Sequence, residues 1–396
     1  MTDVPLSRGL TLLLAAACAL AVATVYFAQP LLAAMALSLG VPLARVGLVV
    51  GATQAGYAVG LLLIVPLGDL LGRKRLILTQ LLVASGSLLA VALAQGWAML
   101  LAAMAMVGLM AVVVQVMVAH AATLASPAQQ GQAVGTVTSG IVLGILLARL
   151  VSGVFADLLG WRGVYVGAAG LALLMAMLLA WRLPATPAAS AGQRYRDLLL
   201  STLTLYRDDR LLRQRGLLAL LIFAAFSVLW SAMVLPLTAP AHALSPTQVG
   251  LFGLAGVAGA LAASRAGRLA DQGHGPRTTV LALALLTLSW LPSAMLDHSL
   301  LALVLGVLML DLAVQAVHVT NQSLLLAGRA AMASRLIGAY MCCYSVGSGL
   351  GAMAASWMYE AAGWSAVCGL GAGISALACV CAVVQNKKPA AKLRAL

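Results

Sequence analysis

Long apolar stretches, separated by short breaks rich in Gly, Pro or charge, follow one another along almost the entire chain. A membrane-spanning helix needs roughly 20 mainly apolar residues, and about twelve stretches reach this length. Because a membrane β-strand alternates apolar and polar positions over about ten residues, these unbroken stretches predict helices. The expected spans are residues 10–35, 43–66, 76–95, 97–124, 133–155, 161–181, 216–237, 247–263, 278–296, 299–326, 336–357 and 364–384.

The composition supports a membrane protein. Hydrophobic residues make up 63% of the 396 residues and charged residues only 8%, which is too little charge for the surface of a soluble protein of this length. The six cysteines lie in apolar stretches, where a thiol behaves as a small hydrophobic group, so we expect neither a disulfide framework nor a metal site. The first apolar stretch is too long to be the core of a cleaved signal and is expected to be the first span.

The net charge of +13 is placed unevenly along the chain. If the N-terminus is cytoplasmic, 20 of the 23 Lys and Arg residues fall in cytoplasmic segments; Arg45 and Arg162 fall at periplasmic ends, and Arg149 lies inside a span. Cytoplasmic loops of membrane proteins carry an excess of positive charge. The pattern therefore predicts a multi-pass protein of the bacterial inner membrane with both termini in the cytoplasm, and it disfavours nucleic acid as a partner.

The chain also repeats itself. Shifting it by 203 residues aligns landmarks of the first half with those of the second: Gly135 with Gly338, Gly144 with Gly347, Asp157 with Glu360, Gly160-Trp161 with Gly363-Trp364, and Val46-Gly47 with Val249-Gly250. Six spans per half is an even number, so the two halves share one orientation, as in one known transporter architecture. We expect an N-terminal bundle at 1–182, a cytoplasmic linker at 183–215, and a C-terminal bundle with a basic tail at 216–396.

The linker begins as a loop containing Pro184, Pro187 and Ser190. From Tyr195 to Arg213, apolar and basic residues then alternate at helical spacing, which predicts an amphipathic helix on the cytoplasmic membrane surface. A role as a basic connector is favoured over a regulatory one.

Two cytoplasmic loops have matching chemistry. In the first, glycines permit a sharp reversal, an aspartate can stabilise a helix N-terminus, and a basic triplet can pair with that aspartate or with lipid headgroups. The loop between spans eight and nine repeats this arrangement. The residues concerned are Gly68, Asp69, Gly72, Arg73, Lys74 and Arg75 in the first loop and Gly267, Arg268 and Asp271 in the second. A purely topological basic turn is the alternative reading.

These loops resemble the signature loop of the major facilitator superfamily, which latches the two halves of those transporters on the cytoplasmic side. Four other stretches resemble a bacterial branch of drug- and sugar-efflux-like permeases: Tyr26–Leu32, Gly144–Arg149, Gly160–Arg162 and Leu310–Gln315. The similarity extends from about residue 10 to 384. The resemblance implies an all-α membrane protein with twelve transmembrane helices in two pseudo-symmetric six-helix bundles. It also implies transport of a small molecule, without a cofactor and without an enzymatic reaction.

Asp311 is the one carboxylate of ten that falls in the middle of an expected span. Three further residues, Gln315, His318 and Gln322, follow it on one helical stripe, with Asn321 beside them. Charge within a span marks a functional site by default, and a carboxyl in an apolar site favours its neutral form. We therefore expect Asp311 to carry protons with His318 as a relay, and the stripe to face a substrate cavity. A structural hydrogen-bond network is the alternative.

Arg149 is the basic residue within a span, and leaving it unpaired costs about 2.5–3.5 kcal/mol. It either extends toward the periplasm or faces the cavity and pairs with a carboxylate, with Asp311 one option, or with an anionic substrate. Six further polar residues in the spans are candidates for the substrate cavity, although such residues often only form hydrogen bonds between neighbouring helices. They are Tyr26, Gln29, Gln54, Tyr57, Gln115 and His120.

A Gly-x-x-x-x-Gly-Lys nucleotide loop is absent from the sequence, which points to an ion gradient as the energy source. One proton moving down 100 mV supplies about 2.3 kcal/mol. The leading hypothesis is proton-coupled export of a small, fairly apolar compound by a monomer embedded in the bilayer. The alternatives are uptake of a sugar or metabolite, and a non-transporting membrane receptor or scaffold.

Overall fold

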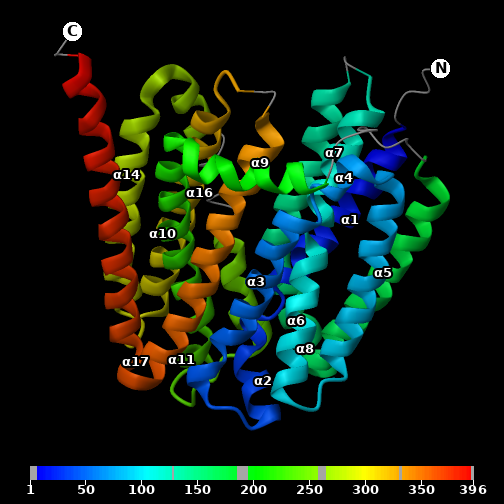
Figure 1. Cartoon of the computed structure of the whole chain (residues 1–396). Helices are drawn as coiled ribbons and strands as arrows, with labels where there is room; N and C mark the ends of the chain where they lie inside the picture. The colour runs from blue at the N-terminus through cyan, green and yellow to red at the C-terminus, as the bar shows by residue number, and fades with distance from the viewer. Residues whose placement is uncertain (1–6, 127–128, 185–194, 257–264, 330–331, 394–396) are drawn as a thin grey trace. The chain divides into compact units, whose positions relative to one another are not determined.

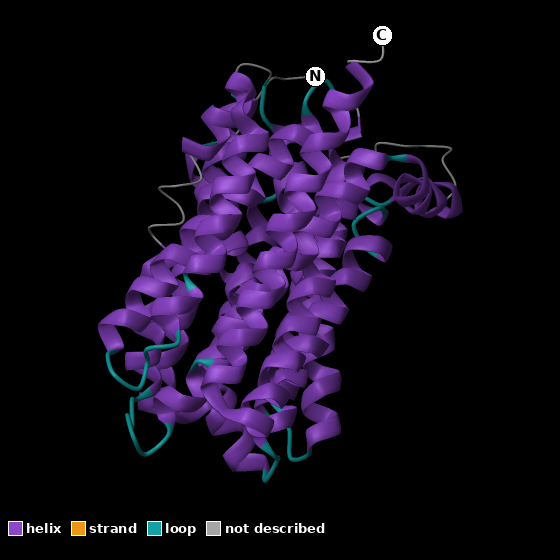
Figure 2. Cartoon of the chain, turned by 90° about the vertical axis from the view of Figure 1, so that its left-hand side faces the viewer, coloured by secondary structure: helices purple, strands orange, loops and turns teal. Residues whose placement is uncertain are grey.

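The computed structural model describes residues 7–126, 129–184, 195–256, 265–329 and 332–393. Every regular element within these ranges is helical, as Figure 2 shows. The chain is therefore an all-α membrane protein, as predicted. The elements of its first part are α1 (Arg8–Tyr26), η1 (Gln29–Leu31), α2 (Leu32–Leu39), η2 (Leu43–Arg45), α3 (Gly47–Leu63), α4 (Leu67–Leu70), α5 (Arg73–Ala92), α6 (Trp97–Ala111), α7 (Val113–Leu124) and α8 (Gln130–Arg182).

The second part of the chain repeats this pattern, with a separate helix between the two parts. Its described elements are α9 (Tyr195–Asp208), α10 (Arg210–Ala232), α11 (Val234–Thr238), α12 (Pro246–Leu251), η3 (Phe252–Ala255), η4 (Ala270–His274), α14 (Gly275–Leu288), α15 (Trp290–Ser293), α16 (Leu300–Leu326) and α17 (Ala333–Leu393). Helices fall on all twelve expected spans, although the eighth is described only to residue 256.

Within the described residues, eight helices are long and apolar enough to cross a membrane. Two of them contain two spans each, because α8 and α17 reverse direction at a glycine. Gly160 has φ 72° and ψ 165°, and Gly363 has φ 74° and ψ −171°. This backbone region is essentially restricted to glycine. The two glycines lie 203 residues apart, so the sequence repeat is also a repeat of local conformation.

The chain divides into two compact units. Unit 1 comprises Met1–Val41, Ala52–Ser201 and Leu244–Gly253. Within it α1, α5, α7 and α8 pack side by side (Figure 1). Gly140 and Gly144 let α8 approach α1 closely, because a Cβ at either position would overlap the backbone of that helix.

Unit 2 comprises Pro42–Gly51, Thr202–Ala243 and Leu254–Leu396. Within it α10 packs along α17 and α16, and α14 packs on the same two helices (Figure 1). Gly347 and Gly351 on α17 lie against the α10 backbone in the same manner. The bundle and linker boundaries expected from the sequence stay a prediction.

Each unit contains a short segment from the other half of the sequence, and an acidic side chain accepts hydrogen bonds from that segment. In unit 1 the carboxylate of Asp157 accepts hydrogen bonds from Thr247 N at 3.0 Å and Ser245 Oγ at 2.9 Å, at the start of α12. In unit 2 the carboxylate of Glu360 accepts one from Ala44 N. These acids occupy equivalent positions of the repeat, and negative charge is favourable at a helix N-terminus.

The helix α9 lies within the range expected for the linker helix, and it ends at Asp208, before Arg213. Asp209 begins a new helix, because its side chain accepts a hydrogen bond from Leu212 N at 2.9 Å. α10 therefore starts at Arg210 and includes residues that the sequence assigned to the linker. Near the end of α9, Tyr206 donates to Ala339 O at 2.6 Å, and burial raises the pKa of its phenol.

Candidate functional site

The first signature-like loop is closed by an arginine within unit 1. Arg73 donates to Gly68 O at 3.3 Å and to Ala119 O and Thr123 Oγ1, both at 3.2 Å. These contacts fasten the start of α5 to α7 and to the turn before it. The side chains of Asp69 and Asp271 lie outside the described residues, as do those of Lys387–Arg394 and the linker residues Pro187 and Ser190. The latch function of both loops stays a prediction.

In unit 1 the structure brings together three of the predicted cavity residues. Arg149 is only 3% exposed, and its Nε donates to Gln29 Oε1 at 2.6 Å. The guanidinium carbon lies 5.2 Å from the centre of the Tyr26 ring, a cation–π distance. The guanidinium is therefore held inside the protein, on groups from α1 and η1. Arg149 belongs to unit 1 and Asp311 to unit 2, so a pairing between them stays a prediction.

The other unit 1 candidates lie on separate helices. Gln54 and Tyr57 are buried on α3, His120 is fully buried on α7, and Gln115 is half-buried on the same helix. Gln54 Oε1 accepts no hydrogen bond within the described part of the chain.

In unit 2, Asp311 lies in the middle of α16 and is 4% exposed. The indole nitrogen of Trp230 on α10 donates to its Oδ1 at 3.1 Å. Indole is a neutral donor, so this contact orients the carboxyl group without adding a positive charge. A protonated carboxyl still accepts at its other oxygen, so the hydrogen bond is compatible with both protonation states.

His318 lies two helical turns from Asp311, about 10 Å along the axis. Its Nδ1 is 3.0 Å from the Tyr340 hydroxyl and its Nε2 is 3.3 Å from Gln322 Nε2. Since the Gln322 amide nitrogen donates, Nε2 accepts and the neutral ring carries its hydrogen on Nδ1. The polar residues predicted to form one stripe on this helix thus form two separate hydrogen-bonded groups, one around Asp311 and one around His318.

Aromatic side chains of α10 connect these two groups. Phe223 contacts the His318 ring with 5.1 Å between centroids, Phe226 lies 6.0 Å from Phe223, and Trp230 lies 6.1 Å from Phe226. The three aromatic residues follow one another at intervals of three and four, which places them on one face of the helix. The half-buried Gln315 is the polar residue of α16 between Asp311 and His318.

The structure adds a buried arginine that the sequence analysis placed in the linker. Arg215 lies in the second turn of α10, is 8% exposed, and donates from Nη1 to Asn321 Oδ1 at 3.4 Å. The positive-inside pattern gave no sign that Arg215 is buried, because an arginine near the end of a span normally faces lipid headgroups. Trp230 was also missed, and only its repeat position, occupied by Phe27 in the first half, pointed to an aromatic residue there.

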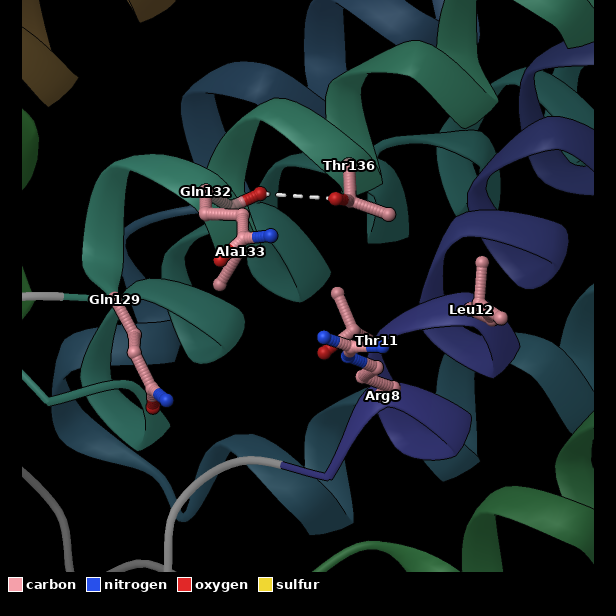
Figure 3. A pocket seen from close by; sticks show the side chains of 7 residues that line it. All are labelled: Arg8, Thr11, Leu12, Gln129, Gln132, Ala133 and Thr136. Carbon is pink, nitrogen blue, oxygen red and sulfur yellow. Dashed lines mark hydrogen bonds between the residues drawn. The ribbon is translucent and has the colours of Figure 1, made fainter.

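A separate pocket of about 280 Å³ lies between the starts of α1 and α8 in unit 1 (Figure 3). Thr136 on its wall donates to Gln132 O at 2.9 Å, the dashed line in the figure. The pocket is lined by Arg8, Thr11, Leu12, Gln129, Gln132, Ala133 and Thr136. None of the predicted cavity residues is among them, so this pocket is distinct from the Asp311 and Arg149 groups.

The sequence profile of the Major Facilitator Superfamily matches residues 12–341 and 216–395. A putative uncharacterized transporter of Escherichia coli (strain K12), YgaY, is 44% identical over 370 residues, covering 93% of this chain and 94% of the relative. A probable transporter of Streptomyces coelicolor, SCO4007, is 30% identical over 365 residues, covering 90% of this chain and 83% of the relative.

Solved structures share the fold at low sequence identity. A bacterial homologue of the human lysosomal transporter Spinster, in an inward-facing and occupied conformation, superposes with a TM-score of 0.78 at 15% identity, covering 96% of each chain. The human organic anion transporter MFSD10 (TETRAN) gives 0.68 at 22% identity, covering 95% of this chain and 99% of that one.

Proposed function

The chain belongs to the Major Facilitator Superfamily and is a multi-pass membrane transporter, and from this premise we propose that it exports a small, largely apolar compound in exchange for protons. The observation that carries the proposal is the buried carboxyl of Asp311 in the middle of a spanning helix. A carboxyl there has no solvent to stabilise its charge. Proton uptake and release at this position therefore change the local charge in the transport path.

Trp230 acts as a positioning residue in this proposal. Its indole fixes one carboxyl oxygen at 3.1 Å and offers no charge that would hold the group permanently ionised. An arginine or lysine in the same place would favour the carboxylate strongly. The neutral donor thus suits a group that exchanges its proton during each cycle.

His318 serves as the second proton-accepting group in this proposal. With both termini in the cytoplasm, as we propose, α16 runs toward the cytoplasm and His318 lies on the cytoplasmic side of Asp311. The separation of about 10 Å excludes direct transfer, so water has to carry the proton across it, and Gln315 can only orient that water through hydrogen bonds. Tyr340 and Gln322 orient the imidazole.

The test uses purified protein in proteoliposomes and a compound found by a thermal-shift screen. We expect Asp311→Asn to lower transport driven by a pH gradient at least tenfold, a loss of about 1.4 kcal/mol or more in the driving step, while the ligand-induced thermal shift persists. Asp297→Asn makes the same change at an exposed acid of unit 2 and is expected to transport normally. Unchanged pH-driven transport by Asp311→Asn would refute the proton role.

Uptake of a sugar or metabolite is the second candidate, because the same site serves either direction. Export predicts that cells lacking the protein accumulate more of the identified compound. Uptake predicts that they accumulate less.

A further inference from the structure

We infer that unit 2 contains a binding site for the carboxylate of a small organic acid, formed by Arg215, Asn321 and Tyr340. The inference rests on the proposed transport function, because it assigns the chemical class of the transported compound: a monocarboxylic acid with an apolar body. It does not depend on proton coupling at Asp311.

The first observation is a buried positive charge that has no negative partner among the described residues. Arg215 is 92% buried, since only 8% of its surface is exposed. Its one described hydrogen bond goes from Nη1 to Asn321, an uncharged acceptor at 3.4 Å, and Nε has no partner within the described part of the chain. A buried guanidinium is normally paired with an acid, and no described residue supplies one to Arg215, so we expect an anionic ligand to take this place.

The neighbouring carboxylate along the helix is already used. Asp209 caps α10 through Oδ1 and forms an ion pair with Arg329 through Oδ2. Asp311 is more than four turns of α10 away, where it accepts from Trp230. Burial disfavours the charge of Arg215, and an incoming anion would relieve this cost.

The second observation is a set of hydrogen-bond donors beside the guanidinium. Asn321 is fully buried, and its Nδ2 has no hydrogen-bond partner among the described residues. The Tyr340 side chain lies beside Asn321 and interacts with it. Because its oxygen accepts from His318, its own hydrogen remains available to donate. Two of these donors, Arg215 Nε and Asn321 Nδ2, have no acceptor among the described residues, and such a pair is suited to an oxyanion.

The charge of the site selects a carboxylate over a phosphate. Arg215 supplies one positive charge, and Asn321 and Tyr340 supply neutral donors. The Nε edge of a guanidinium binds a carboxylate through two parallel hydrogen bonds. A doubly charged phosphate would remain half-neutralised in this buried place, which is costly.

Aromatic side chains next to the donors suit the apolar body of such an acid. Phe223 contacts His318 at 5.1 Å and Tyr344 at 4.1 Å between ring centroids. His318 and Gln322 are only half-buried, so protein does not fully cover the group. An aromatic or short aliphatic acid therefore matches both the charged and the apolar part of the site.

Benzoate and benzamide provide a direct test, because they have the same shape and differ in charge. Thermal unfolding of the purified full-length protein is followed at constant ionic strength and pH. We expect benzoate to raise the melting temperature saturably and benzamide to leave it unchanged. Arg215→Gln should weaken the apparent benzoate affinity at least about tenfold. The same substitution at the exposed Arg213, two residues earlier on α10, should leave it unchanged.

Two further variants keep the test decisive if Arg215→Gln folds poorly. Arg215→Lys retains the positive charge but cannot form two parallel hydrogen bonds to a carboxylate. It should therefore fold normally and bind benzoate more weakly than the wild type. Asn321→Ala should weaken benzoate binding, and benzamide should again leave the melting temperature unchanged. Without ligand, Arg215→Gln should melt no lower than the wild type, because it removes an unpaired buried charge.

Equal benzoate affinity in wild type and Arg215→Gln would overturn the inference. So would a thermal shift with inorganic phosphate or with short-chain phosphatidylglycerol but none with benzoate, since the group would then bind phosphate or a lipid headgroup. Asp311→Asn separates the two proposals: it should bind benzoate normally. Loss of pH-driven transport with intact benzoate binding supports proton coupling independently of the acid site.

Discussion

Buried polar side chains differ in whether their neighbours satisfy them. Gln29 and Gln54 are both amides in the core of unit 1, 3% and 4% exposed. Gln29 Oε1 accepts a short hydrogen bond from the Arg149 guanidinium, whereas Gln54 Oε1 accepts none within the described residues. The same residue type therefore contributes differently to stability in the two places.

Replacing these amides with methionine should reveal that difference. We expect Gln29→Met to lower the free energy of unfolding by about 1–3 kcal/mol, because it removes a hydrogen bond to a charged group. Gln54→Met should be neutral or slightly stabilising, because it removes an unsatisfied polar atom at nearly constant volume. Thermal or denaturant unfolding in detergent measures both. A larger loss for Gln54→Met would contradict the assignment.

Among the helices, α8 and α17 stand out because each contains two spans joined at a left-handed glycine. The turn needs no residues outside the helix, since Gly160 and Gly363 alone change the chain direction. The following tryptophan anchors each turn: Trp161 Nε1 donates to Ser38 Oγ at 3.0 Å and Trp364 Nε1 to Ser293 O at 2.9 Å. This recurring Gly-Trp pair made the repeat visible in the sequence.

The backbone requirement at Gly160 is testable without steric complications. No atom lies within 4 Å of a Cβ built at Gly160 or at Gly170. We expect Gly160→Ala to destabilise the protein by about 1–3 kcal/mol, because alanine is strained at φ 72°. Gly170→Ala, in the helical part of α8, should instead stabilise by about 0.5–1 kcal/mol. Equal melting temperatures for the two variants would show that the turn does not constrain residue 160.

For the whole molecule, the distribution of positive charge predicts the orientation in the membrane. With the N-terminus in the cytoplasm, the basic loops, α9 and the C-terminal tail are all cytoplasmic. The segment 239–245 between α11 and α12, which contains no Lys or Arg, is then periplasmic. The positive-inside rule gives the physical reason.

Reporter fusions in a Gram-negative host test this orientation. A fluorescent protein fused after residue 396 should fluoresce, and alkaline phosphatase fused there should be inactive. Alkaline phosphatase fused after residue 243 should be active, because it reaches the oxidising periplasm. The reverse pattern would place both termini outside, and Asp311 and His318 would then exchange their cytoplasmic and periplasmic positions.

The sequence alone determined the all-helical class, the twelve spans, the repeat and the mid-span position of Asp311. These properties depend on the apolar length and periodicity of one helix at a time. They are local, and lipid imposes them on every spanning segment in the same way. The resemblance of two loops and several spans then indicated the correct family.

The tertiary structure decided which polar atoms meet. Trp230 and Asp311 lie 81 residues apart and Arg149 and Gln29 lie 120 apart, so no helical period relates them. The sequence placed His318 beside Asp311 on one stripe, but the close packing of α10 and α17 against α16 gave each a different partner. Arg215 became a buried residue for the same reason: α10 begins at Arg210, before the expected start of its span at residue 216. Partners of buried polar groups depend on helix packing, which the pattern along one helix does not encode.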